Sequence, residues 1–236
     1  MSSKAVNILG VRVDNLSLSE ALLRAEDLLE SGGAHYIVTP NPEIVLRAYR
    51  DSRLREILNN ASMSLCDGMG VFLAGMLNGK RFTQRITGVD FMDALCHRAA
   101  EKKWRVAFVG ASSDVRENLC AHYQQMHPAS FFQSLADEMM NKPVDADIIF
   151  VALGAPKQEE WMVVRQKSFD ARGVMVGVGG AFDILAGSLP RAPQSMRSLG
   201  LEWLWRIFLQ PWRIKRVVNA VIVFPIVYSI NILKNL

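Results

Sequence analysis

The sequence of 236 residues contains few cysteines and histidines, and neither type occurs at a spacing typical of metal ligands. Its three cysteines, Cys66, Cys96 and Cys120, lie far apart and form no CxxC pair. This usage argues against a disulfide scaffold and a zinc ribbon, and it fits a reducing cytosol. The spacing of the four histidines argues equally against a zinc site and a Ser-His-Asp triad.

Signals of secretion and of common nucleotide-binding loops are also missing. Residues 1–7 hold one lysine and no apolar run, so they do not resemble a secretory signal. No Gly-Lys-Ser/Thr sequence is present, which excludes a Walker A loop. The stretch Gly177-Val-Gly-Gly180 lacks the full GxGxxG spacing, which disfavours a nicotinamide-dependent oxidoreductase.

The charge of the chain is divided unevenly between two segments. Half of all residues are apolar and 21% are charged, so the chain can bury a sizeable core. Residues 1–190 carry 20 basic and 22 acidic side chains, whereas residues 191–236 carry seven basic and one acidic. We therefore expect a core over 1–190 and an appendage over 191–236, and we expect anionic partners to meet the appendage.

Apolar strands and helices alternate in the second half of the core. Strands are predicted at 106–109, 147–153 and 174–178, each ending at a glycine, with helices over 113–127 and 156–169. Continuous apolar strands between helices predict an α/β fold, a Rossmann-like parallel sheet with helices on both faces. Ligands of such sheets bind at the carboxyl ends of the strands.

The first half of the core supplies further elements of the same kind. Ser17 and Glu20 have the spacing of a capping box, and Thr87 is a candidate helix cap with Asp90 at the third helical position. The patterns predict strands at 7–14, 36–39 and 63–66, and helices at 17–29, 43–50, 52–60, 71–77 and 87–103.

Polar residues follow two of the predicted strands. Thr39 and Asn41 could bind the hydroxyl groups of a ligand, although turn chemistry explains the same residues. Asp67 could serve as a general base or could cap the next helix. For each of these residues, the spacing alone leaves both the functional and the structural interpretation open.

Two further motifs point to phosphate and to metal. Gly154-Ala-Pro-Lys-Gln-Glu159 lies where a strand turns into a helix, which favours phosphate binding over the alternative of a tight turn, because three glycine-ended strands share this edge of the sheet. Asp145-Ala-Asp147 has the form of a metal-binding DxD. It precedes its strand, so we expect a solvated loop at the opposite edge of the sheet.

The appendage interleaves arginines with tryptophans. Such a mixture over 191–216 is compatible with nucleic acid, with a partner helix, or with an anionic membrane surface. The apolar residues 217–236 favour the membrane. Because asparagines, a proline and a lysine interrupt this tail, we expect monotopic association and not a spanning helix.

Several motifs together resemble one known family, the WecG/TagA/CpsF glycosyltransferases (glycosyltransferase family 26), over nearly the whole chain. The motifs are Thr39-Pro-Asn41, Cys66-Asp-Gly68, Arg85-Ile-Thr-Gly88, Gly154-Ala-Pro-Lys-Gln-Glu159, Gly177-Val-Gly-Gly-Ala-Phe-Asp183, Arg191-Ala-Pro193, Gly200-Leu-Glu-Trp-Leu-Trp-Arg206 and Pro211-Trp-Arg-Ile-Lys-Arg216. Each motif is weak alone, and their order and spacing make the resemblance specific. The segment between His127 and Asp147 is shorter than in many members, so nucleotide contacts from that loop are not carried over.

The resemblance implies an inverting transfer of a sugar from a UDP-sugar to a sugar linked to undecaprenyl diphosphate. It implies no cofactor and no DxD-bound metal, no nucleic-acid partner, and a peripheral position at the cytoplasmic face of the inner membrane. The family's catalytic base falls on Asp67, with Thr39, Asn41, Arg85 and Gln158 as the other active-site residues. The candidate nucleotide and diphosphate contacts are Gly110, Ala111, Gly154, Lys157, Glu159, Gly179, Gly180, Phe182, Asp183, Arg191, Arg206, Arg213 and Arg216.

The sequence leaves the sugar and the pathway open. N-acetylmannosamine, its uronic acid, glucose and glucuronic acid are all compatible with the resemblance. The alternative from another functional class is a catalytically silent nucleotide-binding scaffold of a membrane polysaccharide assembly. A homo-oligomer that covers the apolar appendage is a further expectation.

Overall fold

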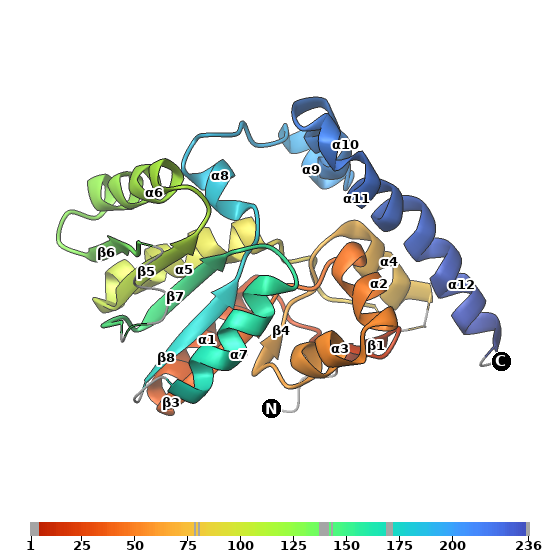
Figure 1. Ribbon diagram of the computed structural model, residues 1–236, viewed down its shortest axis with the longest axis horizontal. Coiled ribbons are helices and arrows are strands. Elements are labelled where there is room, and N and C mark those ends of the chain that lie inside the picture. Colours follow the sequence, from red (N-terminus) through yellow and green to blue (C-terminus); the bar gives the residue numbers. More distant parts are fainter. Residues whose placement is uncertain are drawn as a thin grey trace.

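The computed structural model describes residues 5–77, 79, 81–136, 142, 144–168 and 172–234. A six-stranded sheet with the order β4-β3-β8-β7-β5-β6 forms its centre, and all neighbouring strands are parallel (Figure 1). The strands are β3 (Gly33–Val38), β4 (Met63–Ser64), β5 (Arg105–Gly110), β6 (Phe131–Ser134), β7 (Ile148–Ala152) and β8 (Arg172–Gly177). The predicted α/β class and parallel sheet are confirmed.

Helices cover both faces of the sheet, and alternate strand residues enter two different apolar clusters. On β7, Ile149 and Val151 pack with residues of α2, α3 and α7, whereas Ile148 and Phe150 pack with those of α1, α5, α6 and α8. These strands read as continuous apolar runs because neither face meets water. The helices are α1 (Leu18–Glu30), α2 (Pro42–Arg50), α3 (Ser52–Asn59), α5 (Gly88–Lys102), α6 (Ser113–Met126), α7 (Lys157–Ser168) and α8 (Ala181–Leu185).

The predicted helix starts at Ser17 and Thr87 are confirmed. The hydroxyl of Ser17 accepts from the backbone N–H of Glu20, whose carboxylate accepts from the N–H of Ser17 in return. Thr87 accepts from the N–H of Asp90 at the start of α5. Each contact satisfies a helix N–H that has no partner within its own helix, which fixes where the helix begins.

Two parts of the sheet prediction were wrong or incomplete. The predicted strand over 7–14 is an antiparallel hairpin of β1 (Val6–Ile8) and β2 (Val11–Val13), because Leu9 and Gly10 turn the chain at φ of 52° and 88°. Strand β6 was not predicted, since only Phe132 of its four residues is buried.

The predicted end of α7, Phe169, lies outside the described residues.

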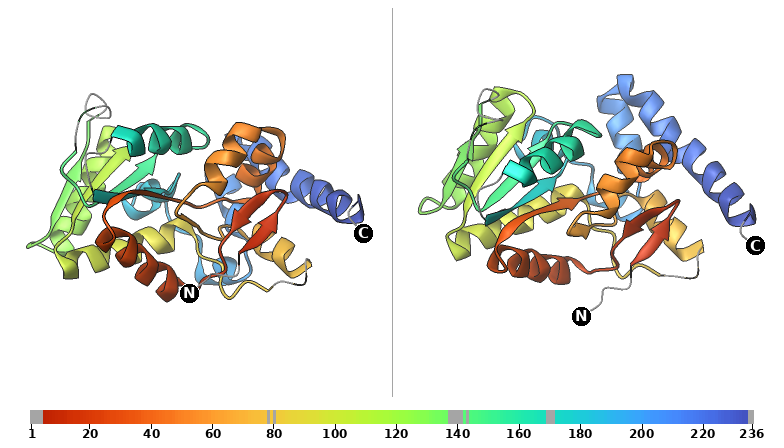
Figure 2. Two further views of the ribbon diagram at one scale, coloured as in Figure 1. Left: turned by 90° about the horizontal axis from the view of Figure 1, so that it is seen from below. Right: turned by 60° about the horizontal axis from the view of Figure 1, so that its bottom comes forward.

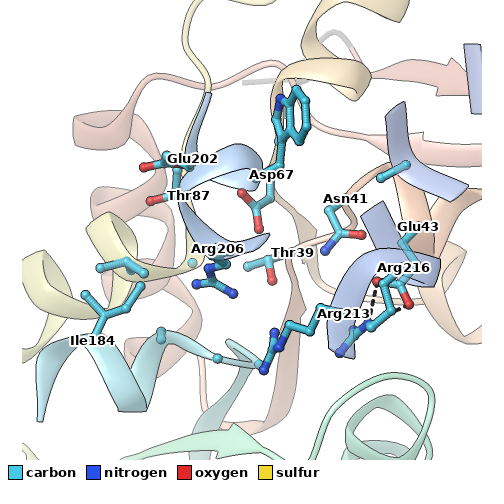
Figure 3. Close-up of a pocket in the computed structure, with 18 of the residues that line it drawn as sticks. Thr39, Asn41, Glu43, Asp67, Thr87, Ile184, Glu202, Arg206, Arg213 and Arg216 are labelled. Atoms are coloured by element: carbon cyan, nitrogen blue, oxygen red, sulfur yellow. Dashed lines mark hydrogen bonds and ion pairs between the residues drawn. The ribbon is translucent and has the colours of Figure 1, made fainter. Parts of the chain in front are cut away.

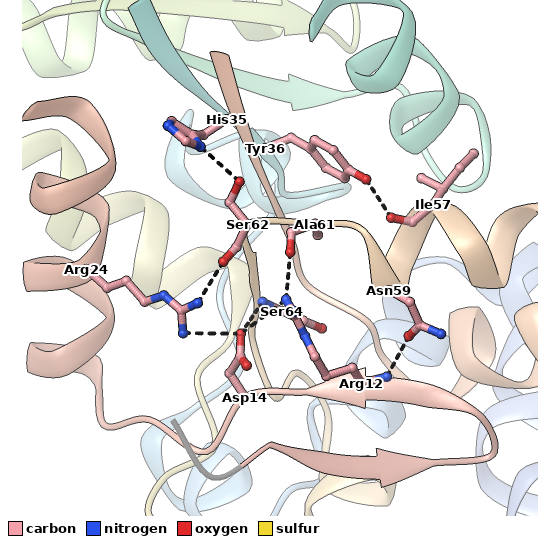
Figure 4. A network of polar contacts seen from close by, with 10 residues as sticks. All are labelled: Arg12, Asp14, Arg24, His35, Tyr36, Ile57, Asn59, Ala61, Ser62 and Ser64. Carbon is pink, nitrogen blue, oxygen red and sulfur yellow. Dashed lines mark hydrogen bonds and ion pairs between the residues drawn. The ribbon is translucent and has the colours of Figure 1, made fainter. Parts of the chain in front are cut away.

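A polar network ties the hairpin to β4 (Figure 4). The buried Asp14 accepts from the N–H of Ser64 at 2.9 Å and donates its own N–H to the carbonyl of Ser64 at 2.8 Å. Arg12 and Arg24 each approach the Asp14 carboxylate to 3.6 Å, which compensates its buried charge. The network therefore fixes the short strand that ends three residues before Asp67.

The appendage begins with α9 (Gln194–Ser198) and α10 (Glu202–Leu209) and continues as one long helical run. The run comprises a 3₁₀ turn (Pro211–Arg213), α11 (Ile214–Val218), a π-helical turn (Asn219–Val223) and α12 (Phe224–Lys234). It extends to the end of the molecule opposite β5 and β6 (Figure 2). α12 rests on α4 (Met69–Leu77), where the hydroxyl of the buried Tyr228 donates to the carbonyl of Ala74 at 2.6 Å.

The other side of this helical run is apolar and exposed. Among the described residues, Pro211–Lys234 is long and apolar enough to cross a membrane, with a mean hydropathy of 1.8 over its best window. Its length and composition suit a spanning helix and a helix that lies on a membrane surface alike. The exposed apolar side chains of the run are Trp212, Ile214, Val218, Val221, Ile222, Ile226, Ile230 and Leu233.

Candidate active site

A pocket of about 870 Å³ lies between the carboxyl edge of the sheet and the appendage (Figure 3). Core residues that follow β3, β4, β5, β7 and β8 form one wall, and α10 to α12 form the other. The following predicted site residues line it: Thr39, Asn41, Asp67, Arg85, Ala111, Gly154, Gln158, Gly179, Gly180, Asp183, Arg191, Arg206, Arg213 and Arg216. The chain therefore brings together residues that lie up to 177 positions apart in the sequence.

Thr39 and Asn41 each keep one polar function directed at the pocket. The Thr39 hydroxyl donates to the carbonyl of Gly177 at 2.8 Å, so its oxygen remains an acceptor. The side-chain oxygen of Asn41 caps α2 by accepting from the N–H of Ile44 at 3.0 Å. Its amide nitrogen has no partner among the described residues and remains a donor. The turn interpretation of Asn41 is thus correct for one end of the side chain, and the other end is free for a ligand.

Asp67 carries an unpaired carboxylate in the pocket. Burial, followed by the negative charge of Glu202, raises its pKa to about 6, while Arg206, Arg85 and the N–H of Gly68 act in the opposite direction. α4 begins two residues later, at Met69. Among the described residues, the backbone N–H that acts on the Asp67 carboxylate is that of Gly68, which precedes the helix, so the structure gives no sign that Asp67 caps α4. A carboxylate with this pKa is a stronger base than an ordinary aspartate and is still ionised at neutral pH.

Arg85 lies beside Asp67 and binds the appendage. Its Nη1 pairs with a carboxylate oxygen of Glu202 at 3.0 Å, and its Nη2 donates to the carbonyl of Arg197 at 2.9 Å. The predicted active-site arginine therefore lines the pocket while it joins the core to the appendage. Both ends of its guanidinium are occupied in this arrangement.

Gln158 supports the turn after β8. Its side-chain oxygen accepts from the N–H of Gly179 at 3.2 Å, and its nitrogen donates to Glu159 at 2.7 Å. Glu159 is buried, which raises its pKa, and it lies behind the pocket wall. Gln158 can thus hold the glycine turn in place as well as border the ligand.

Four predicted nucleotide contacts do not line the pocket: Gly110, Lys157, Glu159 and Phe182. Lys157 is exposed at the start of α7, and Phe182 is fully buried in the apolar core. Gly110 is packed so closely that a Cβ atom there would meet the backbone of Ala152 at 2.7 Å. Their role in nucleotide binding stays a prediction.

Four arginines of the appendage line the pocket, and three of them, Arg206, Arg213 and Arg216, are drawn in Figure 3. Burial and the neighbouring charges of Arg206 and Arg216 lower the pKa of Arg213. Arg216 pairs with Glu43 at 2.8 Å, whereas Arg206 and Arg213 have no ion pair among the described residues. Neighbouring cations that form no ion pair favour a bound anion, and arginine binds phosphate oxygens through two parallel hydrogen bonds.

Gly180 allows Arg206 to approach the core. A Cβ atom at this position would stand 3.1 Å from Nη1 of Arg206, closer than an ordinary contact. The predicted glycine turn after β8 therefore has a packing reason that does not depend on a dinucleotide. It lets a guanidinium group lie against the backbone at the carboxyl edge of the sheet.

The Asp145-Ala-Asp147 motif lies at the opposite edge of the sheet. Asp147 accepts from the N–H of Arg105 at the start of β5, and the Arg105 guanidinium pairs with Asp145. This placement agrees with the sequence interpretation of a loop away from the ligand. No group of three or more His, Cys, Asp or Glu side chains in the described part of the chain is arranged to hold a metal ion.

The sequence reasoning missed two carboxylates of the pocket, Glu43 and Glu202. Glu43 follows Asn41 by two residues and pairs with Arg216 of the appendage. Glu202 is the lone acidic residue among the seven basic ones of 191–236. That isolation was the available signal, because a single acid in a basic segment is readily held by a specific cation.

The opposite end of the pocket is apolar. It is lined by Leu73 of α4 together with Val217, Val221 and Pro225 of the appendage. The pocket thus combines charged side chains with apolar side chains from α4 and the exposed helical run. Such an arrangement suits a ligand with an anionic head and a hydrocarbon tail.

Comparisons with known proteins agree with this geometry. A family model described as "Glycosyl transferase WecG/TagA/CpsF family" matches residues 6–235. Two relatives from Staphylococcus aureus, of strains MRSA252 and NCTC 8325, are each 34% identical over 223 residues. The match covers 90% of this chain and 87% of each relative. Both relatives are named N-acetylglucosaminyldiphosphoundecaprenol N-acetyl-beta-D-mannosaminyltransferase.

Proposed function

Because this chain belongs to the WecG/TagA/CpsF family of glycosyltransferases, we propose that it moves one sugar from a UDP-sugar to a sugar carried on undecaprenyl diphosphate. The observation that carries this proposal is the pocket itself. It sets a carboxylate without an ion pair, Asp67, near two arginines that form no ion pair among the described residues, Arg206 and Arg213. These are the two charges that a sugar transfer needs.

The proposed reaction is a single displacement. Asp67 takes the proton of the acceptor hydroxyl as its oxygen attacks C1 of the donor sugar. The bond between C1 and the diphosphate oxygen breaks, and its electron pair leaves with UDP. The configuration at C1 inverts, which fits the β-linkage in the relatives' names if the donor is α-linked. Thr39 and Asn41 are placed to orient sugar hydroxyls.

Arg206 and Arg213 receive the negative charge that develops on the leaving diphosphate. Fixed cations in a partly dry pocket can stabilise such charge by several kcal/mol, on the order of 3 kcal/mol for one well-placed donor. We propose that they act in place of a metal ion, so that transfer does not need a divalent cation.

N-acetylmannosamine is the first donor sugar to test, because the two relatives are named for it. The acceptor that their names give, N-acetylglucosaminyldiphosphoundecaprenol, fits the two ends of the pocket. Its diphosphate would lie toward the arginines, and its hydrocarbon chain would leave past Leu73 and Val221. N-acetylmannosaminuronic acid, glucose and glucuronic acid complete the panel of donors.

We place the enzyme at the cytoplasmic face of the inner membrane as a peripheral protein. The exposed side of the run Pro211–Lys234 supports contact with a membrane, together with Leu73, Met76 and Leu77 of the adjacent α4. The helix keeps one side on the core through Phe224 and Tyr228, which favours lying on the surface over spanning it. A second copy of the chain could cover the same apolar side away from the membrane.

The test is UDP release from the panel of UDP-sugars, with and without a short-chain lipid-diphosphate-sugar acceptor, in EDTA. Asp67→Asn runs alongside the wild type. The proposal predicts acceptor-dependent release from one donor, lost in the variant. Binding of UDP without release from any donor, across several acceptors, would favour a silent nucleotide-binding scaffold. Release that stops in EDTA and returns with a divalent cation would contradict metal independence.

A further inference from the structure

Glu202 is the only acidic residue of the appendage, and it does not face solvent as an ordinary surface charge would. It lines the pocket from the first turn of α10 and pairs with Arg85 of the core at 3.0 Å. The two residues are 117 positions apart, so the pair exists only when the appendage lies on the core.

Arg85 forms ion-pair and hydrogen-bond contacts with the appendage and no ion pair with Asp67. Its two terminal nitrogens are used by Glu202 and by the carbonyl of Arg197, both of the appendage. Asp67 has no ion pair among the described residues, although Arg85 and Arg206 lie near enough to act on it through space. Without the appendage, Arg85 would lose both partners and would have Asp67 as a neighbouring carboxylate.

We propose that Glu202 is a positioning residue of the active site: it holds Arg85 against the appendage, so that Asp67 is left unpaired as a base only while the appendage is closed over the core. The inference rests on the proposed function of Asp67 as the base. It adds a role for the appendage that is separate from its arginines. When the appendage lies on the core, it supplies the arginines for the leaving diphosphate. It also supplies Glu202, which pairs with Arg85 and so leaves Asp67 without an ion pair.

The electrostatics of the pocket agree with this assignment. After burial, Glu202 is the largest influence that raises the pKa of Asp67, and Arg206 and Arg85 are the charges that lower it. The neighbouring Cys66 is a buried thiol whose own pKa is raised, so it stays neutral. Removing the charge of Glu202 would take away one anion near Asp67 and leave Arg85 uncompensated. Both changes lower the pKa of Asp67.

A purely structural role for Glu202 predicts something different. If Glu202 only attached the appendage, its loss would lower kcat/KM by the same factor at every pH. If Glu202 positions Arg85, the acid limb of the pH profile must move as well. The pH profile therefore separates the two roles even when the total activity falls in both cases.

The experiment is the pH dependence of kcat/KM for acceptor-dependent UDP release by the full-length protein. The variants are Glu202→Gln, which removes the charge, and Glu202→Asp, which keeps it. Glu43→Gln is the matched control, since it also breaks an ion pair between core and appendage, with Arg216, but Glu43 is not among the charges that act on Asp67. Asp67→Asn is measured in the same series.

We expect an acid limb near pH 6 in the wild type and a limb about one pH unit lower in Glu202→Gln. Glu202→Asp should restore the limb, and Glu43→Gln should leave it in place whatever its effect on rate. A limb in Glu202→Gln that coincides with the wild type would overturn the inference while the function of Asp67 stands. Full activity of Asp67→Asn would instead overturn the proposed function, and the inference with it.

Discussion

The core and the appendage hold their shapes in different ways. In the core, strands are buried on both faces, and alternate residues of β7 enter two separate apolar clusters. The appendage is 46 residues long but supplies ten of the 18 large apolar side chains that are exposed in the described chain. It is fixed by a few contacts, such as Arg85 with Glu202, Glu43 with Arg216, and Tyr228 with Ala74.

This difference shows how the site is divided. The core contributes the carboxylate of Asp67 and the hydrogen-bonding side chains at the strand ends, and the sheet determines their positions. The appendage contributes Arg206, Arg213 and Arg216 and an apolar surface, and its position depends on contacts with the core. The core contains the proposed base, and the appendage contains the arginines proposed to bind the diphosphate. The site for a lipid-linked acceptor is therefore complete only where the core and the appendage lie together.

The largest expected effect concerns the cations of the appendage. Arg213→Ala should lower kcat for UDP release about 100-fold, because one fixed charge on the leaving group is lost. Arg213→Lys should recover part of the rate, since it restores the charge without the planar fork. The control is Lys215→Ala, an exposed cation of the same helical run that does not line the pocket. Equal losses in both alanine variants would contradict a specific role for Arg213.

The next prediction concerns the apolar surface of the appendage. Ile226→Ser should weaken binding to anionic vesicles about tenfold or more, because a buried isoleucine contributes roughly 2 kcal/mol. Leu23→Ser on α1 is a matched control, since Leu23 is 56% exposed and Ile226 is 55% exposed. Vesicle co-sedimentation measures both variants. The membrane assignment fails if Leu23→Ser weakens binding as much as Ile226→Ser.

The third prediction uses Asp67 to compare function with stability in the core. Folding raises the pKa of Asp67 from 3.8 to about 6, so the folded state holds a proton that the unfolded state releases between these values. Stability from this group is therefore present below pH 4, is lost as the pH rises to 6, and stays lost above it. Asp67→Asn should be more stable than the wild type by about 1–2 kcal/mol at pH 7, allowing for solvent at the pocket.

Chemical denaturation of both proteins at pH 4 and pH 7 measures this difference. The stabilisation should be seen at pH 7 and should become much smaller at pH 4, where the folded wild type is protonated at Asp67 and the unfolded chain is only partly ionised there. A variant that is less stable than the wild type at pH 7 would mean that Asp67 is held by favourable contacts, contrary to its unpaired state.

The smallest expected effect concerns the attachment of α12. Tyr228→Phe removes the hydrogen bond to the Ala74 carbonyl, worth about 1 kcal/mol. Because α12 rests on the core through few contacts, the loss should appear as faster limited proteolysis within 211–234 and not as a lower midpoint for the core. A lowered core midpoint with unchanged proteolysis would show that the appendage and the core unfold as one unit.

The sequence predicts the core better than the appendage, for physical reasons. Strands β5, β7 and β8 are recognisable because burial on both faces leaves a continuous apolar run, and Ser17 and Thr87 mark helix starts through local hydrogen bonds. The hairpin was missed because its turn contains Leu9, an apolar residue that hides the change of direction. Strand β6 was missed because it is short and mostly uncovered.

The same reasons apply to the site. Thr39, Asn41 and Asp67 follow strands directly, so the parallel sheet places them at one edge. The pairing of Arg85 with Glu202 joins positions 117 apart, and no local pattern encodes it. Only the fold shows that the appendage brings an anion as well as cations to the pocket.

The active site divides its two roles between Asp67 of the core, the proposed base, and Arg213 of the appendage, which is proposed to bind the diphosphate. Calorimetric titration of UDP into the wild type, Asp67→Asn and Arg213→Ala measures this division directly. We predict that Asp67→Asn binds UDP at least as tightly as the wild type, because it removes a negative charge near the diphosphate, whereas Arg213→Ala binds at least tenfold more weakly. Unchanged affinity in Arg213→Ala, or lost affinity in Asp67→Asn, would contradict the account.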